Sequence, residues 1–153
     1  MTEDGQFIPS AIAATAKGSL RRVLSAGDAN ELFSSMLRRM TLDCVEAGSW
    51  MIGHIKANVR SGDEMLSMSS TTDDGNVRLR YSFGKDVKDY AMTANLIVYG
   101  VERHKAAEIF VTNVKRTLGD AETEVHSEIG CEDPGCSDPM CSDAGHERII
   151  KIT

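Results

Sequence analysis

The chain has 153 residues and a formal net charge of −6, with 41% hydrophobic, 26% charged and only 5% aromatic residues. This length predicts one domain whose core needs neither disulfide nor metal to fold, and methionine and aliphatic side chains must fill most of that core. The acidic balance argues against a nucleic-acid partner, and no apolar run is long enough to cross a membrane.

The N-terminal part begins with a weakly patterned stretch, residues 1–27, which predicts a loosely docked arm. Asp28 then precedes an amphipathic run that ends near Gly48, and Glu31 occupies the reciprocal position of a capping box. Apolar residues recur at helical spacing along this run and predict its buried face: Phe33, Met36, Leu37, Met40 and Cys44. We expect Cys44 to be a buried, inert thiol.

After Gly48 the hydrophobic period changes from helical spacing to two, which predicts strands. In residues 50–61, Met51, Ile55 and Val59 should face inward. Residues 64–70 form a second expected strand, and an Asp-Gly turn leads to a third at 76–83. In that third strand the pattern places four residues inward: Val77, Leu79, Tyr81 and Phe83. Together they predict an antiparallel meander.

Residues 84–90 are interpreted as a loop. Residues 93–101 follow and are apolar on both faces, which is typical of a strand that is central in a sheet or covered on both sides. Glu102 opens a second helix that Gly119 should end. We expect one joint core of eight residues from the inward phases: Phe33, Met36, Met40, Ile55, Leu79, Phe110, Val114 and Leu118.

These elements predict an α+β fold, with a mainly antiparallel sheet, two helices packed on one of its faces and a cysteine-rich loop near the C-terminus. The expected organisation is an N-terminal arm over residues 1–27, a core domain over 28–120 and a hairpin-like extension over 121–153. Two short β-like runs, ETEVHSEI and ERIIKI, flank the cysteine-rich loop in this extension.

The loop carries potential metal ligands at a constant step of five residues. They are three cysteines and two histidines: His126, Cys131, Cys136, Cys141 and His146. Asp-Pro pairs between them favour turns that would bring successive cysteines toward one centre. We prefer a first shell of the three cysteines with His146, and His126 is the substitute fourth ligand. Hereafter these five residues are called the Cys/His pentad.

Zinc fits this ligand set better than nickel, cobalt or iron. Two other interpretations stay open. In the first, the pentad is part of an acidic tail with incidental cysteines. In the second, its thiols form a redox pair, although acidic neighbours work against a lowered thiol pKa. The acidic N-terminus does not resemble a signal peptide, so we expect a cytoplasmic protein, in which cysteines act as ligands or reactive thiols rather than in lasting disulfides.

Two short motifs carry a family resemblance, Ile52-Gly53-His54-Ile55-Lys56-Ala57 and Leu96-Ile97-Val98-Tyr99-Gly100-Val101-Glu102. With the order of elements over residues 28–119, they resemble the C-terminal domain of the CobW-like GTPases of the G3E group, especially the archaeal forms. The phosphate-binding loop of that family is absent from this sequence, so the resemblance implies an association with metal or cofactor delivery but not GTP hydrolysis. His54 matches the motif, yet we expect it to be solvated or hydrogen-bonded.

No catalytic constellation is present in the sequence: it contains no nucleophile elbow, no HExxH motif and no GxGxxG motif. The sequence therefore predicts a non-enzymatic module for metal binding or for delivery of a metal or cofactor. Its partner would be a GTPase or a metalloprotein, and the pattern leaves the oligomeric state open. The alternatives are a protein–protein interaction or regulatory domain, and, third, a small thiol oxidoreductase.

Overall fold

A computed structural model describes residues 8–127 and 148–150. In this part of the chain seven strands form one sheet, and two helices accompany it. The helices are α1 (Ala26–Glu46) and α2 (Arg103–Leu118). The strands are β1 (Ser10–Leu24), β2 (Met51–Ser61), β3 (Glu64–Ser70), β4 (Arg78–Tyr81), β5 (Val87–Tyr99), β6 (Glu122–Ser127) and β7 (Arg148–Ile150).

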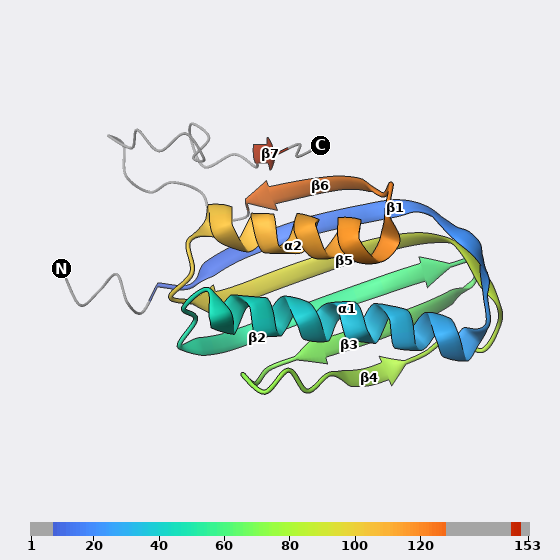
Figure 1. Cartoon of the computed structure of the whole chain (residues 1–153), viewed down its shortest axis with the longest axis horizontal. Helices are drawn as coiled ribbons and strands as arrows, with labels where there is room; N and C mark the ends of the chain where they lie inside the picture. The colour runs from blue at the N-terminus through green and yellow to red at the C-terminus, as the bar shows by residue number, and fades with distance from the viewer. Residues whose placement is uncertain (1–7, 128–147, 151–153) are drawn as a thin grey trace.

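The strand order is β4-β3-β2-β5-β1-β6-β7, and every neighbouring pair is antiparallel. Helix α1 joins β1 to β2 across β5, and α2 joins β5 to β6 across β1. These are the two interleaved βαβ units of a ferredoxin-like fold, with the hairpin β3–β4 inserted. Both helices cover the same face of the sheet (Figure 1), which confirms the α+β class and the antiparallel meander β2-β3-β4.

The prediction of a loosely docked arm is wrong for most of its length, because residues 10–24 form β1 near the centre of the sheet. Strand β1 pairs with β5 on one side and β6 on the other. Beyond the expected boundary at 120/121, β6 pairs with β1 and with β7, so the expected hairpin-like extension continues the same sheet. Alternation in β1 is hard to see in the sequence because Ala14 and Ala16 face the core while Ala11 and Ala13 lie on the opposite face.

Helix α1 begins before the predicted position. Ser25 is its N-cap, and its hydroxyl accepts a 3.2 Å hydrogen bond from the backbone N–H of Asp28. Asp28 therefore lies in the first turn, where its negative carboxylate interacts favourably with the positive end of the helix dipole. The side chain of Glu31 accepts a hydrogen bond from Ser35 rather than closing a capping box. The helix ends at Glu46 with Ala47 as its C-cap, and Gly48 follows with a φ of 112°.

Strand β2 contains a bulge that changes its inward phase. The register with β5 passes from Ile52 opposite Val98 to His54 opposite Ile97, so Gly53 is an extra residue. Ile52 is therefore buried and Met51 is 43% exposed, contrary to the prediction for Met51. A Cβ at Gly53 would lie 2.8 Å from the carbonyl oxygen of Ile97, so only glycine fits the bulge.

The third expected strand is shorter than predicted and lies at the sheet edge. Only residues 78–81 form β4, and all four are exposed. Leu79 and Tyr81 are 45% and 53% exposed, so both inward assignments are wrong, whereas Phe83 is buried as predicted. An edge strand has a neighbour on one side only, and the side chains of β4 remain exposed. The expected loop 84–90 is partly wrong too, because β5 begins at Val87.

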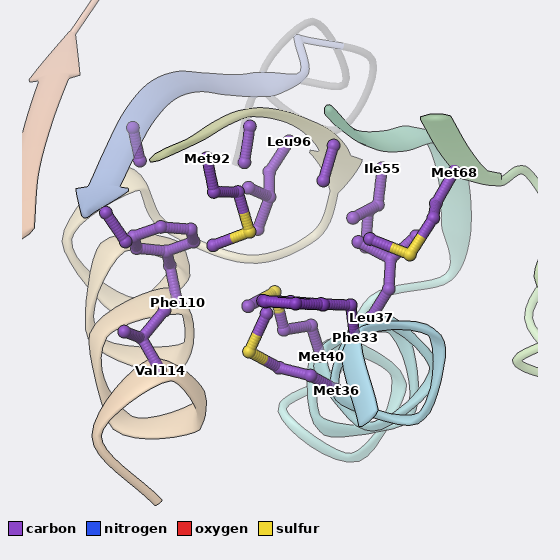
Figure 2. Close-up of a cluster of buried hydrophobic side chains, with 14 of the residues drawn as sticks. Phe33, Met36, Leu37, Met40, Ile55, Met68, Met92, Leu96, Phe110 and Val114 are labelled. Carbon is purple, nitrogen blue, oxygen red and sulfur yellow. The ribbon is translucent and has the colours of Figure 1, made fainter. Parts of the chain in front are cut away.

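Strand β5 is the central strand of the sheet, as its apolar sequence predicted. It faces the two helices across the core (Figure 2), where α1 contributes Phe33 and Met40 and α2 contributes Phe110. Seven of the eight expected core residues are buried, and Leu79 is the exception. The second helix has the predicted bounds, with Glu102 as N-cap and Gly119 as C-cap at a φ of 74°.

Candidate functional site

His126 is the one member of the Cys/His pentad within the described residues. It lies in β6, opposite Ala13 of β1 and Ile149 of β7. Its neighbour Val125 points into the core, so His126 and Glu124 lie on the sheet face away from the helices. The Nε2 atom of His126 is 3.6 Å from a carboxylate oxygen of Glu124, and the His126 side chain is 18% exposed. Its Nδ1 atom is buried and has no hydrogen-bond partner among the described residues.

The other four pentad members, Cys131, Cys136, Cys141 and His146, lie outside the described residues. The strands on either side of them are described, and Ser127 of β6 pairs with Arg148 of β7. Ser127 and Arg148, the described residues on either side of this segment, are therefore neighbours across two strands of the sheet. Within residues 8–127 and 148–150, no group of three or more histidine, cysteine or acidic side chains is arranged to hold a metal ion.

The charge of the chain is concentrated in the segment 128–147. It contains six acidic residues and no lysine or arginine. The whole chain has 23 acidic and 17 basic residues, so removing these six leaves 17 of each sign. The formal charge of −6 therefore resides in the segment that carries the cysteines, and a cation is attracted there rather than to the sheet and helices.

His54 lies far from His126 on the same open face of the sheet. It pairs with Ile97 of β5, whereas His126 is level with Asn95 of β5 through Ala13 of β1. Three strand spacings and one two-residue step separate the histidines, which corresponds to about 14 Å across the strands and about 7 Å along them. They cannot share one metal ion. Burial lowers the pKa of His54, and the nearby Lys56 lowers it further.

Cys44 is fully buried in α1, as its place on the apolar stripe predicted. Burial raises the pKa of its thiol from 9.0 to about 12, with a smaller contribution from Asp43. A thiol with this pKa is neutral at physiological pH and is neither a nucleophile nor a metal ligand. Cys44 therefore supplies no reactive group, and any thiol chemistry of the chain rests on the three pentad cysteines.

An exposed aromatic patch, which sequence analysis missed, lies where β2 begins and β5 ends. It consists of the exposed residues Trp50 and Met51 and the half-buried Tyr99. The rings of Trp50 and Tyr99 are 5.3 Å apart between centroids, and Trp50 remains 50% exposed. A Cβ at Gly100 would lie 2.7 Å from the Trp50 ring, so this glycine creates the space for it. The sequence signal was the single tryptophan of the chain, which stands just before an expected strand. Its partner ring, Tyr99, belongs to a strand that is adjacent in the sheet but distant in the sequence.

No family model matches the chain, and comparisons with curated proteins and with solved structures gave no match. The function must therefore be argued from the residues themselves, because a fold by itself does not identify an activity. In the part of the chain that the structure describes, no helix is both long and apolar enough to cross a membrane.

Proposed function

We propose that this protein is a non-enzymatic module that binds a transition-metal ion, zinc foremost, through the Cys/His pentad. The observation that carries the proposal is the pairing of β6 with β7, which sets Ser127 opposite Arg148. A ligand-bearing segment whose two ends are held at one place has already lost part of the chain entropy that metal binding would otherwise cost. His126 stands one residue before the first end, on a strand that the sheet holds.

The ligand chemistry suits zinc or another borderline-soft metal. Three thiolates and one imidazole form a common tetrahedral zinc set. A carboxylate oxygen of Glu124 is 3.6 Å from Nε2 of His126. The other ring nitrogen, Nδ1, makes no hydrogen bond to a described residue. The six acidic residues of the segment add attraction for a cation but make the free thiols less acidic.

The delivery role and the partner follow from the family resemblance. The two motifs that carry it lie in the neighbouring strands β2 and β5, where Ile52 pairs with Val98. If the resemblance reflects common descent, the module works beside a GTPase or a metalloprotein to which it passes the metal or cofactor. We place it in the cytoplasm, where thiols remain reduced and free to bind metal.

A competition titration against a chromophoric zinc chelator tests this function on protein purified without a histidine tag. We expect one high-affinity zinc per chain, with protons released on binding and weaker affinity as the pH falls, because the thiols must ionise. Cys136→Ser removes the middle thiolate and should abolish this site. Cys44→Ser is the matched control and should bind as the parent protein does. Full zinc uptake by Cys136→Ser would refute the proposal.

A protein-interaction domain is the second candidate, and the aromatic patch favours it. Trp50 and Met51 are 50% and 43% exposed, and tryptophan and tyrosine are enriched among residues that dominate binding energy at interfaces. The two functions are compatible, since a delivery module must dock on its recipient. Trp50→Ala should leave zinc affinity unchanged and weaken only the capture of a partner, which a pull-down with the parent protein and the variant compares directly.

A further inference from the structure

A pocket lined by arginine and leucine lies at the end of the molecule where α1 begins and α2 ends, on the right in Figure 1. Its volume is about 220 Å³. The second half of β1, the first half of α1 and the last turn of α2 supply its walls. The lining side chains that matter are of two kinds, four leucines and three arginines: Leu20, Leu24, Leu32, Leu118, Arg21, Arg22 and Arg116.

An irregularity in β1 exposes two of the arginines. The ladder between β1 and β5 is regular up to Ser19, opposite Asp89, and resumes only at Leu24, opposite Val87. The strand alternates between faces up to Leu20, and then residues 21–23 are all exposed. Such bulges redirect side chains and are frequent beside functional sites. Here Arg21 and Arg22 both line the pocket and are both exposed to solvent.

The third arginine, Arg116, comes from the last turn of α2. Among the described residues, Arg21, Arg22 and Arg116 form no ion pair within 4.0 Å. The guanidinium of Arg21 lies 3.6 Å from the position of a Cβ on Gly119, against the end of α2. The negative end of a helix dipole amounts to about half a unit charge, which is smaller than the summed charge of the three arginines.

The base of the pocket is apolar. Leu20 and Leu118 are buried, and Leu24 and Leu32 are partly buried against the core. A cavity of about 150 Å³ holds a benzene molecule, so about 220 Å³ accommodates one ring or a short acyl chain. Arginine guanidinium groups bind carboxylate and phosphate with paired hydrogen bonds. The two kinds of wall therefore suit a ligand with an anionic head and a small apolar body.

We propose that this pocket binds a small organic anion. Its carboxylate or phosphate group is held by Arg21, Arg22 and Arg116, and its apolar part packs on the leucines. The site lies at the opposite end of the sheet from the point where residues 128–147 leave β6 (Figure 1), so it is independent of the metal proposal.

Nuclear magnetic resonance titration of the full chain tests the proposal with four probes: phenyl phosphate, benzoate, inorganic phosphate and benzyl alcohol. We expect saturable shifts of the amides of Arg22, Leu32 and Gly119 with the first two probes, and at least tenfold weaker binding of the last two. Whichever of phenyl phosphate and benzoate binds more tightly identifies the head group.

The variant Arg21→Ala/Arg116→Ala should weaken binding of phenyl phosphate at least tenfold, because charge-assisted hydrogen bonds are lost. Both side chains are exposed, so its melting temperature should remain close to that of the parent protein. Lys115→Ala is the matched control, since it removes a positive charge from the same helix turn outside the pocket, and it should bind normally. Absence of saturable binding, equal binding of inorganic and phenyl phosphate, or equal affinity in the double variant would overturn the proposal.

Discussion

Replacing Phe33 by alanine should produce one of the largest losses of stability available in this chain. Phe33 is fully buried in α1 and is drawn at the centre of the core in Figure 2. Its ring contacts two others edge-on, Phe83 at 6.3 Å and Tyr90 at 5.7 Å between centroids. These rings come from different parts of the sheet region, so the aromatic cluster joins α1 to β5 and to the segment before it.

The magnitude follows from burial and ring contacts. Phe→Ala in a core costs about 3–5 kcal/mol, and each edge-to-face ring pair contributes about 0.5–1.5 kcal/mol beyond burial. Phe33→Leu retains most of the apolar volume and loses both ring pairs, so it should cost about 1–3 kcal/mol. For a chain of this size a loss of about 4 kcal/mol lowers the melting temperature by roughly 8–16 °C. The ratio of the stability losses in Phe33→Leu and Phe33→Ala thus separates the contribution of side-chain volume from that of the ring contacts.

Urea denaturation followed by far-ultraviolet circular dichroism gives the free energy of unfolding for each variant. Tyr81→Ala is the matched aromatic control, because this ring is 53% exposed on the edge strand, and it should cost less than about 1 kcal/mol. If Phe33→Ala lowers the free energy of unfolding by less than about 1 kcal/mol, while the slope of that free energy against urea concentration is unchanged, the core packing around Phe33 is refuted.

Three further predictions concern single residues. Leu79→Ala should change the free energy of unfolding by less than about 0.5 kcal/mol in the same urea assay, because the side chain is 45% exposed; a loss above 2 kcal/mol would restore its predicted place in the core. Gly53→Ala should lower the melting temperature measurably, because its Cβ would lie 2.8 Å from the Ile97 carbonyl oxygen, and an unchanged temperature would show that the bulge adapts. Burial raises the pKa of Cys44 from 9.0 to about 12, so the folded state favours the protonated thiol. This contribution to the free energy of unfolding is fully present below pH 9 and is lost as the pH rises toward 12. In that range the parent protein should lose up to about 1.4 kcal/mol of stability per pH unit relative to Cys44→Ala, and parallel curves of stability against pH for the two proteins would contradict the burial of the thiol.

Local patterns predicted the two helices well because their apolar residues recur at one clear period. Phe110 and Val114 lie on the buried face of α2, and Gly119 ends it, as expected. Strand β1 escaped prediction because its two faces have similar composition, and alanine has a low intrinsic preference for strands. Its pairing with β5, in which Ala14 lies opposite Ala94, and with β6 on the other side explains why this segment is extended. The strand is held by tertiary contacts rather than by its own sequence.

Sites that combine residues from distant segments of the chain could not be predicted from local sequence patterns either. Arg21 and Arg22 are neighbours in the sequence, but the third arginine of the pocket, Arg116, is contributed by a helix more than ninety positions later. The partner ring of Trp50 likewise comes from β5. The Cys/His pentad is the opposite case, since its spacing is visible in the sequence alone. Of its five members the structure describes His126, and the pentad as a metal site stays a prediction.

X-ray absorption at the zinc edge, measured on protein loaded with one equivalent of zinc, tests the proposed metal site most directly. The account predicts three sulfur atoms at about 2.3 Å from the metal and one imidazole nitrogen at about 2.0–2.1 Å. Because Cys44 is buried with a raised thiol pKa, the three sulfurs must be those of Cys131, Cys136 and Cys141. A spectrum with oxygen and nitrogen scatterers only would contradict the proposal that the pentad binds metal.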